Sequence, residues 1–258
     1  MSKKPHSVSP RPPQKDRMTA SFRTLALSLM LVLPGMAHAQ RIEDKATFDV
    51  VIRGISAASL SFSGAEEGNR YAVSGLLKSA GIAALFRKIS YRATAKGTVN
   101  GTRYTPSSYV EEADNGKTQS TSTMTYSRGV PNAVQYTPPR KGRDKDVNPA
   151  TMGGTVDTLT ALYAILRDVD VGQECKVSLK MYDGRYVSSI ALANLSRQGN
   201  AVICSGQYIR IQGFSAEEMA ERTVFPFTLT YQPLDNGRMR VTEVAMQSIY
   251  GKAAMKRR

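Results

Sequence analysis

The chain has 258 residues and a formal net charge of +14, with 35 Lys and Arg against 21 Asp and Glu. It contains two histidines, two cysteines and no tryptophan, and both histidines precede residue 40. Catalysis by Ser-His-Asp or Cys-His groups and zinc sites that need histidine are therefore excluded for residues 40–258.

The N-terminal segment predicts an export signal. An apolar run over residues 25–33 is followed by a small-x-small site, which predicts cleavage between Ala39 and Gln40. The run is shorter than the roughly 20 apolar residues that a membrane span requires. We therefore predict a leader with a cleavable signal peptide over residues 1–39 and a single β-rich periplasmic domain over residues 40–258. The alternative is a buried N-terminal helix.

The leader has two candidate translation starts, and its basic residues account for part of the net charge of the chain. Translation from Met18 instead of Met1 would give a leader of more typical length. Beyond residue 39 the chain has 29 basic and 20 acidic residues, a net charge of +9. This balance favours anionic lipid headgroups or other envelope polyanions as partners. It also fits nucleic acid, but a nucleic-acid partner does not fit the export signal.

Most of residues 40–258 show the alternation of antiparallel strands with one buried face. Phe48, Val50 and Ile52 alternate with polar residues, and similar runs follow over residues 58–63 and 71–77. Residues 81–86 are ambiguous: they fit a strand, a short helix, or an apolar lip dipping toward lipid with basic residues behind it. The Thr-rich residues 118–126 favour an edge or solvent-facing strand over a core strand.

One helix stands out among these strands. Over residues 155–168 the apolar side chains recur at spacings of three and four, which predicts an amphipathic helix with Thr155 as its N-cap. These features predict a mostly β fold: a curled antiparallel sheet or half-barrel with this helix packed on its concave face. The helix is either a core plug or the lining of an apolar cavity. The ligand-lining candidates are Leu159, Leu162, Tyr163, Ile165 and Leu166.

Two cysteines in an exported chain predict one disulfide, between Cys175 and Cys204. In a flat meander their strands would lie about 9.5 Å apart, whereas a disulfide needs a Cα separation below about 7 Å. Either the sheet curls sharply there, or one cysteine lies just off the strand and crosses over its end. Further on, Ser215 and Glu218 predict a helix capping box, and the basic tail over residues 252–258 is expected to fray.

The order of several motifs resembles a known family. The motifs are Phe48-Asp-Val, the stretch Leu77–Phe86 with Tyr104–Tyr109 after it, the helix Asp157–Leu166, and Met181–Tyr186 followed by Cys204–Gly213. Together they look like the bacterial envelope proteins of the domain-of-unknown-function 3108 family. The resemblance implies a periplasmic, mostly antiparallel β protein, curled like the lipoprotein carrier and sensor folds. It transfers no active-site residue.

We therefore expect a non-enzymatic periplasmic monomer without a cofactor or metal site. Its curled sheet would shelter an apolar or lipid-like ligand, or a lipid-modified envelope partner. Peripheral contact with a membrane is compatible with its charge. Two alternatives remain: a structural or interaction module for envelope integrity without a small ligand, and a carboxylate-dependent cell-wall hydrolase.

Overall fold

The computed structural model of the chain describes Ser9 and residues 41–258. The predicted leader lies outside the described residues, as do its cleavage site at Ala39 and Gln40 and both candidate starts, Met1 and Met18. None of the helices in the described part is long and apolar enough to cross a membrane.

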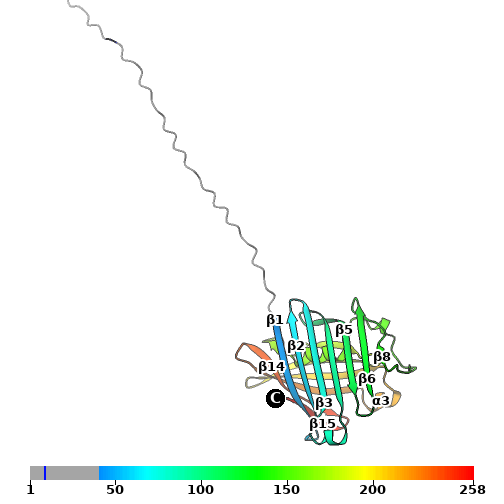
Figure 1. Cartoon of the computed structure of the whole chain (residues 1–258). Helices are drawn as coiled ribbons and strands as arrows, with labels where there is room; N and C mark the ends of the chain where they lie inside the picture. The colour runs from blue at the N-terminus through cyan, green and yellow to red at the C-terminus, as the bar shows by residue number, and fades with distance from the viewer. Residues whose placement is uncertain (1–8, 10–40) are drawn as a thin grey trace, which may run out of the picture. The chain divides into compact units, whose positions relative to one another are not determined.

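Within residues 41–258, fifteen strands form one sheet, and every pairing between these strands is antiparallel. The order along the sheet is β10-β11-β12-β13-β14-β15-β1-β2-β3-β4-β5-β6-β7, with β8 on β6 and β9 on β14. Figure 1 shows the half of the sheet that runs from β1 through β2 and β3 to β5 and β6. The prediction of a mostly antiparallel β fold is confirmed. The strands are β1 (Arg41–Ile52), β2 (Ile55–Glu67), β3 (Arg70–Ser79), β4 (Ser90–Asn100), β5 (Arg103–Asp114), β6 (Gln119–Ser127), β7 (Val130–Pro131), β8 (Gln135–Thr137), β9 (Val169–Asp170), β10 (Ser178–Tyr182), β11 (Val187–Gln198), β12 (Ala201–Gln212), β13 (Val224–Pro233), β14 (Arg238–Ser248) and β15 (Gly251–Arg257).

The C-terminal strand joins the two halves of the sheet. β15 pairs with β14 on one side and with β1 on the other, and Met255 lies opposite both Val244 and Val50. The expectation that this tail frays is wrong. Because β15 lies between β14 and β1, its backbone pairs with a strand on each side.

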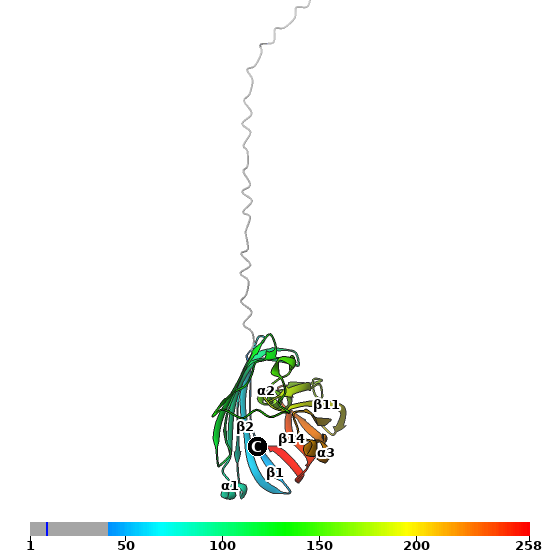
Figure 2. The same cartoon turned by 90° about the vertical axis from the view of Figure 1, so that its right-hand side faces the viewer.

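The predicted helix is α2 (Thr158–Leu166). It contacts β3, β4 and β5 and also β10, and it lies between β2 on one side and β11 and β14 on the other (Figure 2). Its N-cap is Asp157 and not Thr155. The hydroxyl of Thr155 donates instead to the carbonyl of Met152, and the residues between them turn before the helix begins.

Three shorter helical segments complete the fold: α1 (Ala83–Phe86), η1 (Pro149–Thr151) and α3 (Ala216–Glu221). Of the three interpretations of residues 81–86, the short helix is observed. The capping box of Ser215 and Glu218 is confirmed at the start of α3. The Thr-rich strand β6 lies at an end of the sheet, where only the short β7 and β8 pair with its outer side.

The disulfide between Cys175 and Cys204 is present, with a Cα separation of 5.3 Å. Cys204 lies within β12, but Cys175 precedes the first residue of β10 and has a φ of 61°. Of the two predicted geometries, the structure agrees with the second in that one cysteine lies just off the strand. β10 itself begins three residues after Cys175, at Ser178.

Candidate functional site

A cavity of about 240 Å³ lies between α2 and the strands β10 to β15. Its walls are almost entirely apolar. Thr158, Ala161, Leu162, Ile165 and Leu166 come from the helix, and Met181, Ile190, Tyr208, Phe227, Val244, Met246 and Met255 come from the sheet.

The sheet wall follows from strand register. Side chains that face each other across neighbouring antiparallel strands share one face of the sheet. Ile190 pairs with Tyr208, Phe227 with Met246, and Val244 with Met255. The lining is therefore built from three in-register pairs on one face of β11 to β15. Three methionines in this wall give it an adaptable surface, because the unbranched thioether side chain adopts many rotamers.

The opposite face of α2 packs tightly on the other half of the sheet. A Cβ atom on Gly64 of β2 would lie 2.3 Å from Cε2 of Tyr163, and one on Gly75 of β3 would lie 2.7 Å from Cδ1 of Leu159. The two glycines therefore let the helix approach β2 and β3 closely. The remaining space lies on the side of β10 to β15, which is where the cavity is found.

The structure separates the five predicted lining residues into two groups. Leu162, Ile165 and Leu166 line the cavity. Leu159 and Tyr163 instead contact the glycines of the opposite wall, and both are buried. The sequence reasoning missed the sheet residues of the lining. The sequence signal for these residues was the alternation of apolar residues in the last strands, and an ordinary packed core gives the same pattern.

Buried polar groups fix the N-terminal end of α2. The carboxylate of Asp157 accepts hydrogen bonds from the backbone N–H of Thr160 at 2.8 Å and from its hydroxyl at 2.7 Å. The Thr160 hydroxyl is also 2.8 Å from the hydroxyl of Tyr71 on β3. Burial raises the pKa of Asp157 to about 6. This carboxylate is a buried helix cap, tied to the sheet through Thr160.

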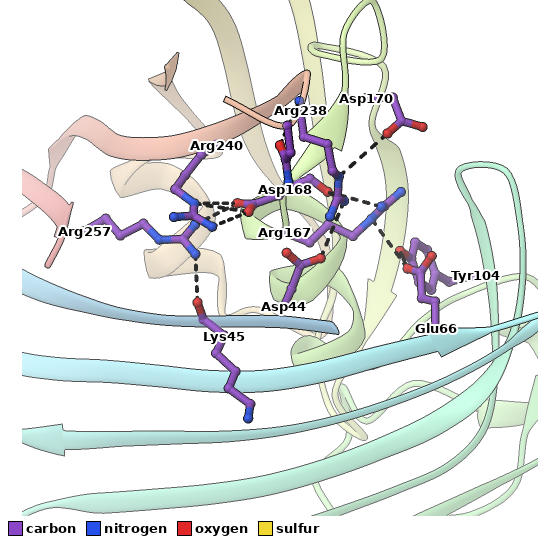
Figure 3. A network of polar contacts seen from close by, with 11 residues as sticks. Asp44, Lys45, Glu66, Tyr104, Arg167, Asp168, Asp170, Arg238, Arg240 and Arg257 are labelled. Carbon is purple, nitrogen blue, oxygen red and sulfur yellow. Dashed lines mark hydrogen bonds and ion pairs between the residues drawn. The ribbon is translucent and has the colours of Figure 1, made fainter. Parts of the chain in front are cut away.

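An arginine cluster fixes the C-terminal end (Figure 3). The buried carboxylate of Asp168 lies 2.6 Å from Nη2 of Arg240 and 3.1 Å from Nη1 of Arg257. Arg238 donates to the carbonyl of Asp168 and lies 3.7 Å from Asp44. Burial raises the pKa of Asp44, and the nearby charge of Asp168 raises it further. Charges of both signs from β1, β14, β15 and the segment that follows α2 therefore meet at the C-terminal end of the helix.

A second ion pair lies beside this cluster. Nε of Arg167 lies 3.6 Å from Oε1 of Glu66, which also accepts a hydrogen bond from the hydroxyl of Tyr104 at 2.6 Å (Figure 3). Both charged side chains are more than four-fifths buried. Arg167 directly follows α2, so the pair ties the end of the helix to β2 and β5.

These buried carboxylates are structural in their contacts: one caps α2, and the others lie against arginines. Among residues 41–258, no group of three or more His, Cys, Asp or Glu side chains is placed to hold a metal ion. A larger hollow, of about 820 Å³, lies on the opposite face of β11 to β15, but its lining mixes alanines with Lys252, Lys256 and Glu243. The 240 Å³ cavity is the better candidate for an apolar ligand.

The fold and the cavity define a mostly β protein, with one large antiparallel sheet and a buried helix that bounds an apolar space. The chain belongs to the family described as "Protein of unknown function (DUF3108)", whose model matches residues 47–198. The resemblance noted in the sequence is thereby confirmed. The match includes α2 and ends at the last residue of β11, so most of the cavity's sheet wall lies beyond it.

No curated protein matches the chain. Among solved structures, it is similar to one described as "Crystal Structure of Beta-barrel-like Protein of Domain of Unknown Function DUF1849 from Brucella abortus". The sequence identity is 9% and the TM-score 0.48, and the similarity covers 85% of this chain and 97% of that chain.

Proposed function

We propose that the chain is a non-enzymatic, exported protein of the bacterial periplasm that holds a single apolar chain or ring of a lipid or a lipid-modified envelope partner. In this proposal the sheet curls as a half-barrel around α2, and the ligand lies between α2 and β10 to β15. The apolar cavity of about 240 Å³ is the observation that carries the proposal.

The size of the cavity limits the ligand. An apolar cavity of about 150 Å³ in another protein admits benzene, and pockets for drug-sized molecules begin at about 300 Å³. A volume of about 240 Å³ therefore suits one acyl segment or one ring, but not a whole two-chain lipid. The headgroup or the protein part of the ligand would stay outside.

The chemistry of the lining favours the same class of ligand. Burying a methylene group contributes about 0.8 kcal/mol, so a short acyl segment gains several kcal/mol without any hydrogen bond. Met181, Met246 and Met255 suit a chain whose exact shape varies. The predicted export signal and the disulfide support an oxidising compartment outside the cytoplasm.

Native mass spectrometry tests the proposal on protein purified from the producing cells without detergent. We expect a discrete lipid-sized mass that is lost on denaturation. If the native mass equals that of the polypeptide, the protein is titrated with a fluorescent short-chain fatty acid. Failure to bind this probe as well overturns the proposal in favour of an interaction module without a small ligand.

Two cavity-filling variants locate the ligand. Leu162→Trp fills the cavity from α2, and Met246→Trp fills it from β14. We expect each to lower the affinity for the probe at least about ten-fold, which corresponds to two lost methylene contacts. Val171→Trp is the matched control, because Val171 is 59% exposed and does not line the cavity. Unchanged probe binding in both filled variants, with folding retained, would place the ligand elsewhere.

A further inference from the structure

Exposed apolar side chains gather at one end of the sheet. Ten large hydrophobic residues are exposed in the described part of the chain, and six of them lie in neighbouring turns at this end. Exposed apolar residues without a function are usually scattered singly over a surface, so this clustering calls for an explanation. Leu85 and Phe86 of α1 are 84% and 86% exposed. We call these turns the rim, defined as residues 53–55, 80–89, 115–118 and 249–252.

Backbone and side-chain contacts connect the segments of the rim. The N–H of Arg53 donates to the carbonyl of Lys252 at 2.8 Å, which joins the β1–β2 turn to the β14–β15 turn. Ala80 donates to the carbonyl of Ala57 at 3.0 Å, so the segment with α1 lies on the start of β2. Nε of Arg87 donates to the carbonyl of Asn115 at 2.6 Å. Figure 2 shows α1 at the end of the sheet where β1 ends.

The rim is also strongly basic. It contains five Lys and Arg residues and no Asp or Glu. None of the ion pairs within residues 41–258 involves any of these five: Arg53, Arg87, Lys88, Lys117 and Lys252. The nearest carboxylate along the chain, Asp114, accepts from the N–H of Gly116 and the amide of Gln119.

We propose that the rim docks the protein on the surface of an anionic lipid bilayer. Exposed apolar side chains at a tip, flanked by unpaired basic residues, match the two layers of such a surface: acyl chains below anionic headgroups. A purely apolar protein partner would leave the five basic residues unmatched. The rim is also close to the cavity along the chain: Met246 lines the cavity, and Ile249, three residues further on, belongs to the rim. Docking would bring the cavity close to lipid.

Vesicle co-sedimentation tests the proposal with residues 39–258, which form a contact unit of their own. We expect binding to vesicles that contain phosphatidylglycerol, little binding to phosphatidylcholine alone, and loss of binding at high salt. The double variant Leu85→Asp with Phe86→Asp should lower binding at least about ten-fold. Lys88→Gln and Lys117→Gln should each lower it about five-fold.

The matched control changes two exposed apolar residues outside the rim, one after β9 and one within β11. Val171→Asp with Leu195→Asp should bind vesicles as the unmodified chain does, because both residues lie outside the rim and are 59% and 46% exposed. Three results would overturn the proposal. The first is a loss of vesicle binding in this control equal to that in the Leu85 and Phe86 variant, and the second is unchanged binding in that variant. The third is no binding of the unmodified chain at low salt. The last result would reassign the rim to a protein partner. Leu162→Trp should still bind vesicles, which separates docking from cavity binding.

Discussion

Tyr163 packs directly against Gly64, with three of its ring carbons within 3 Å of the place where a Cβ atom would stand. The ring is fully buried and also makes edge contacts with Phe62 and Tyr104. It therefore has little room to move away from β2. This contact determines how closely α2 approaches one wall of the fold and how much space remains at the other.

We predict that Gly64→Ala destabilises the protein by about 1–3 kcal/mol, because an added methyl group forces the buried ring of Tyr163 to shift. Any shift of α2 away from β2 narrows the cavity, so affinity for a short-chain fatty-acid probe should fall as well. Chemical denaturation and a probe titration measure the two effects.

Gly142→Ala is the control for this change. The nearest atom to its added Cβ, Oδ2 of Asp146, is 4.0 Å away, so no rearrangement is required. Its stability should stay within about 0.5 kcal/mol of the unmodified protein. Equal stability of the two alanine variants would contradict the role assigned to Gly64.

Local patterns predicted most strands and the central helix, but not how distant strands meet. Alternation identified the first three strands, and the spacing of three and four identified α2. The tail was misjudged because Met255 is its only large apolar residue among basic and small ones. Its order comes from partners near both ends of the chain, in β1 and β14, which no local window contains.

The cavity was predictable only in part, again because the contacts that decide it are distant in sequence. The apolar stripe of α2 showed that Leu162 and Ile165 face something apolar. Whether that side is filled depends on residues opposite the helix, and Gly64 and Gly75 lie about 90 residues earlier. The arginine cluster was equally hidden, because Asp168 is 72 residues from Arg240 and 89 from Arg257. Such contacts become visible only once the sheet order is known.

The disulfide should contribute substantially to stability. In the chain-entropy model, a loop with a sequence separation of 29 corresponds to about 3.5 kcal/mol. We predict that Cys175→Ser with Cys204→Ser loses about this much, and that reductant shifts the unmodified protein to the same denaturation midpoint. Because Cys175 lies next to edge strand β10, which carries Met181 of the cavity lining, probe affinity should also fall. A midpoint insensitive to reductant would contradict this prediction.

Asp157 should make stability depend on pH. Its pKa is raised from 3.8 to about 6 by burial, so between these values the folded chain binds a proton that the unfolded chain has released. The free energy of unfolding therefore falls as pH rises through this window, by on the order of 3 kcal/mol. Asp157→Asn keeps a good N-cap and removes the titration.

Denaturation at several pH values between about 4 and 7 measures this effect. The unmodified protein should lose stability relative to Asp157→Asn as the pH rises. Asp44 and Asp183 also have raised pKa values from burial, but both proteins contain them, so the difference between the two proteins isolates Asp157. A difference that does not change with pH would show that this carboxyl titrates normally.

Asp168 holds two arginines from the C-terminal strands, and its removal should be costly. Arg257 is only 7% exposed, so Asp168→Ala leaves a buried guanidinium without its carboxylate, a loss of about 3–5 kcal/mol. Glu43→Ala breaks the Arg41–Glu43 pair, whose side chains are 58% and 50% exposed, and should cost at most about 1 kcal/mol. Arg240→Ala should fall between the two, because Arg240 is 40% exposed and Arg257 still pairs with Asp168. Urea denaturation of the three variants tests this order. Equal losses for Asp168→Ala and Glu43→Ala would mean that the cluster does not hold β14 and β15 to the end of α2.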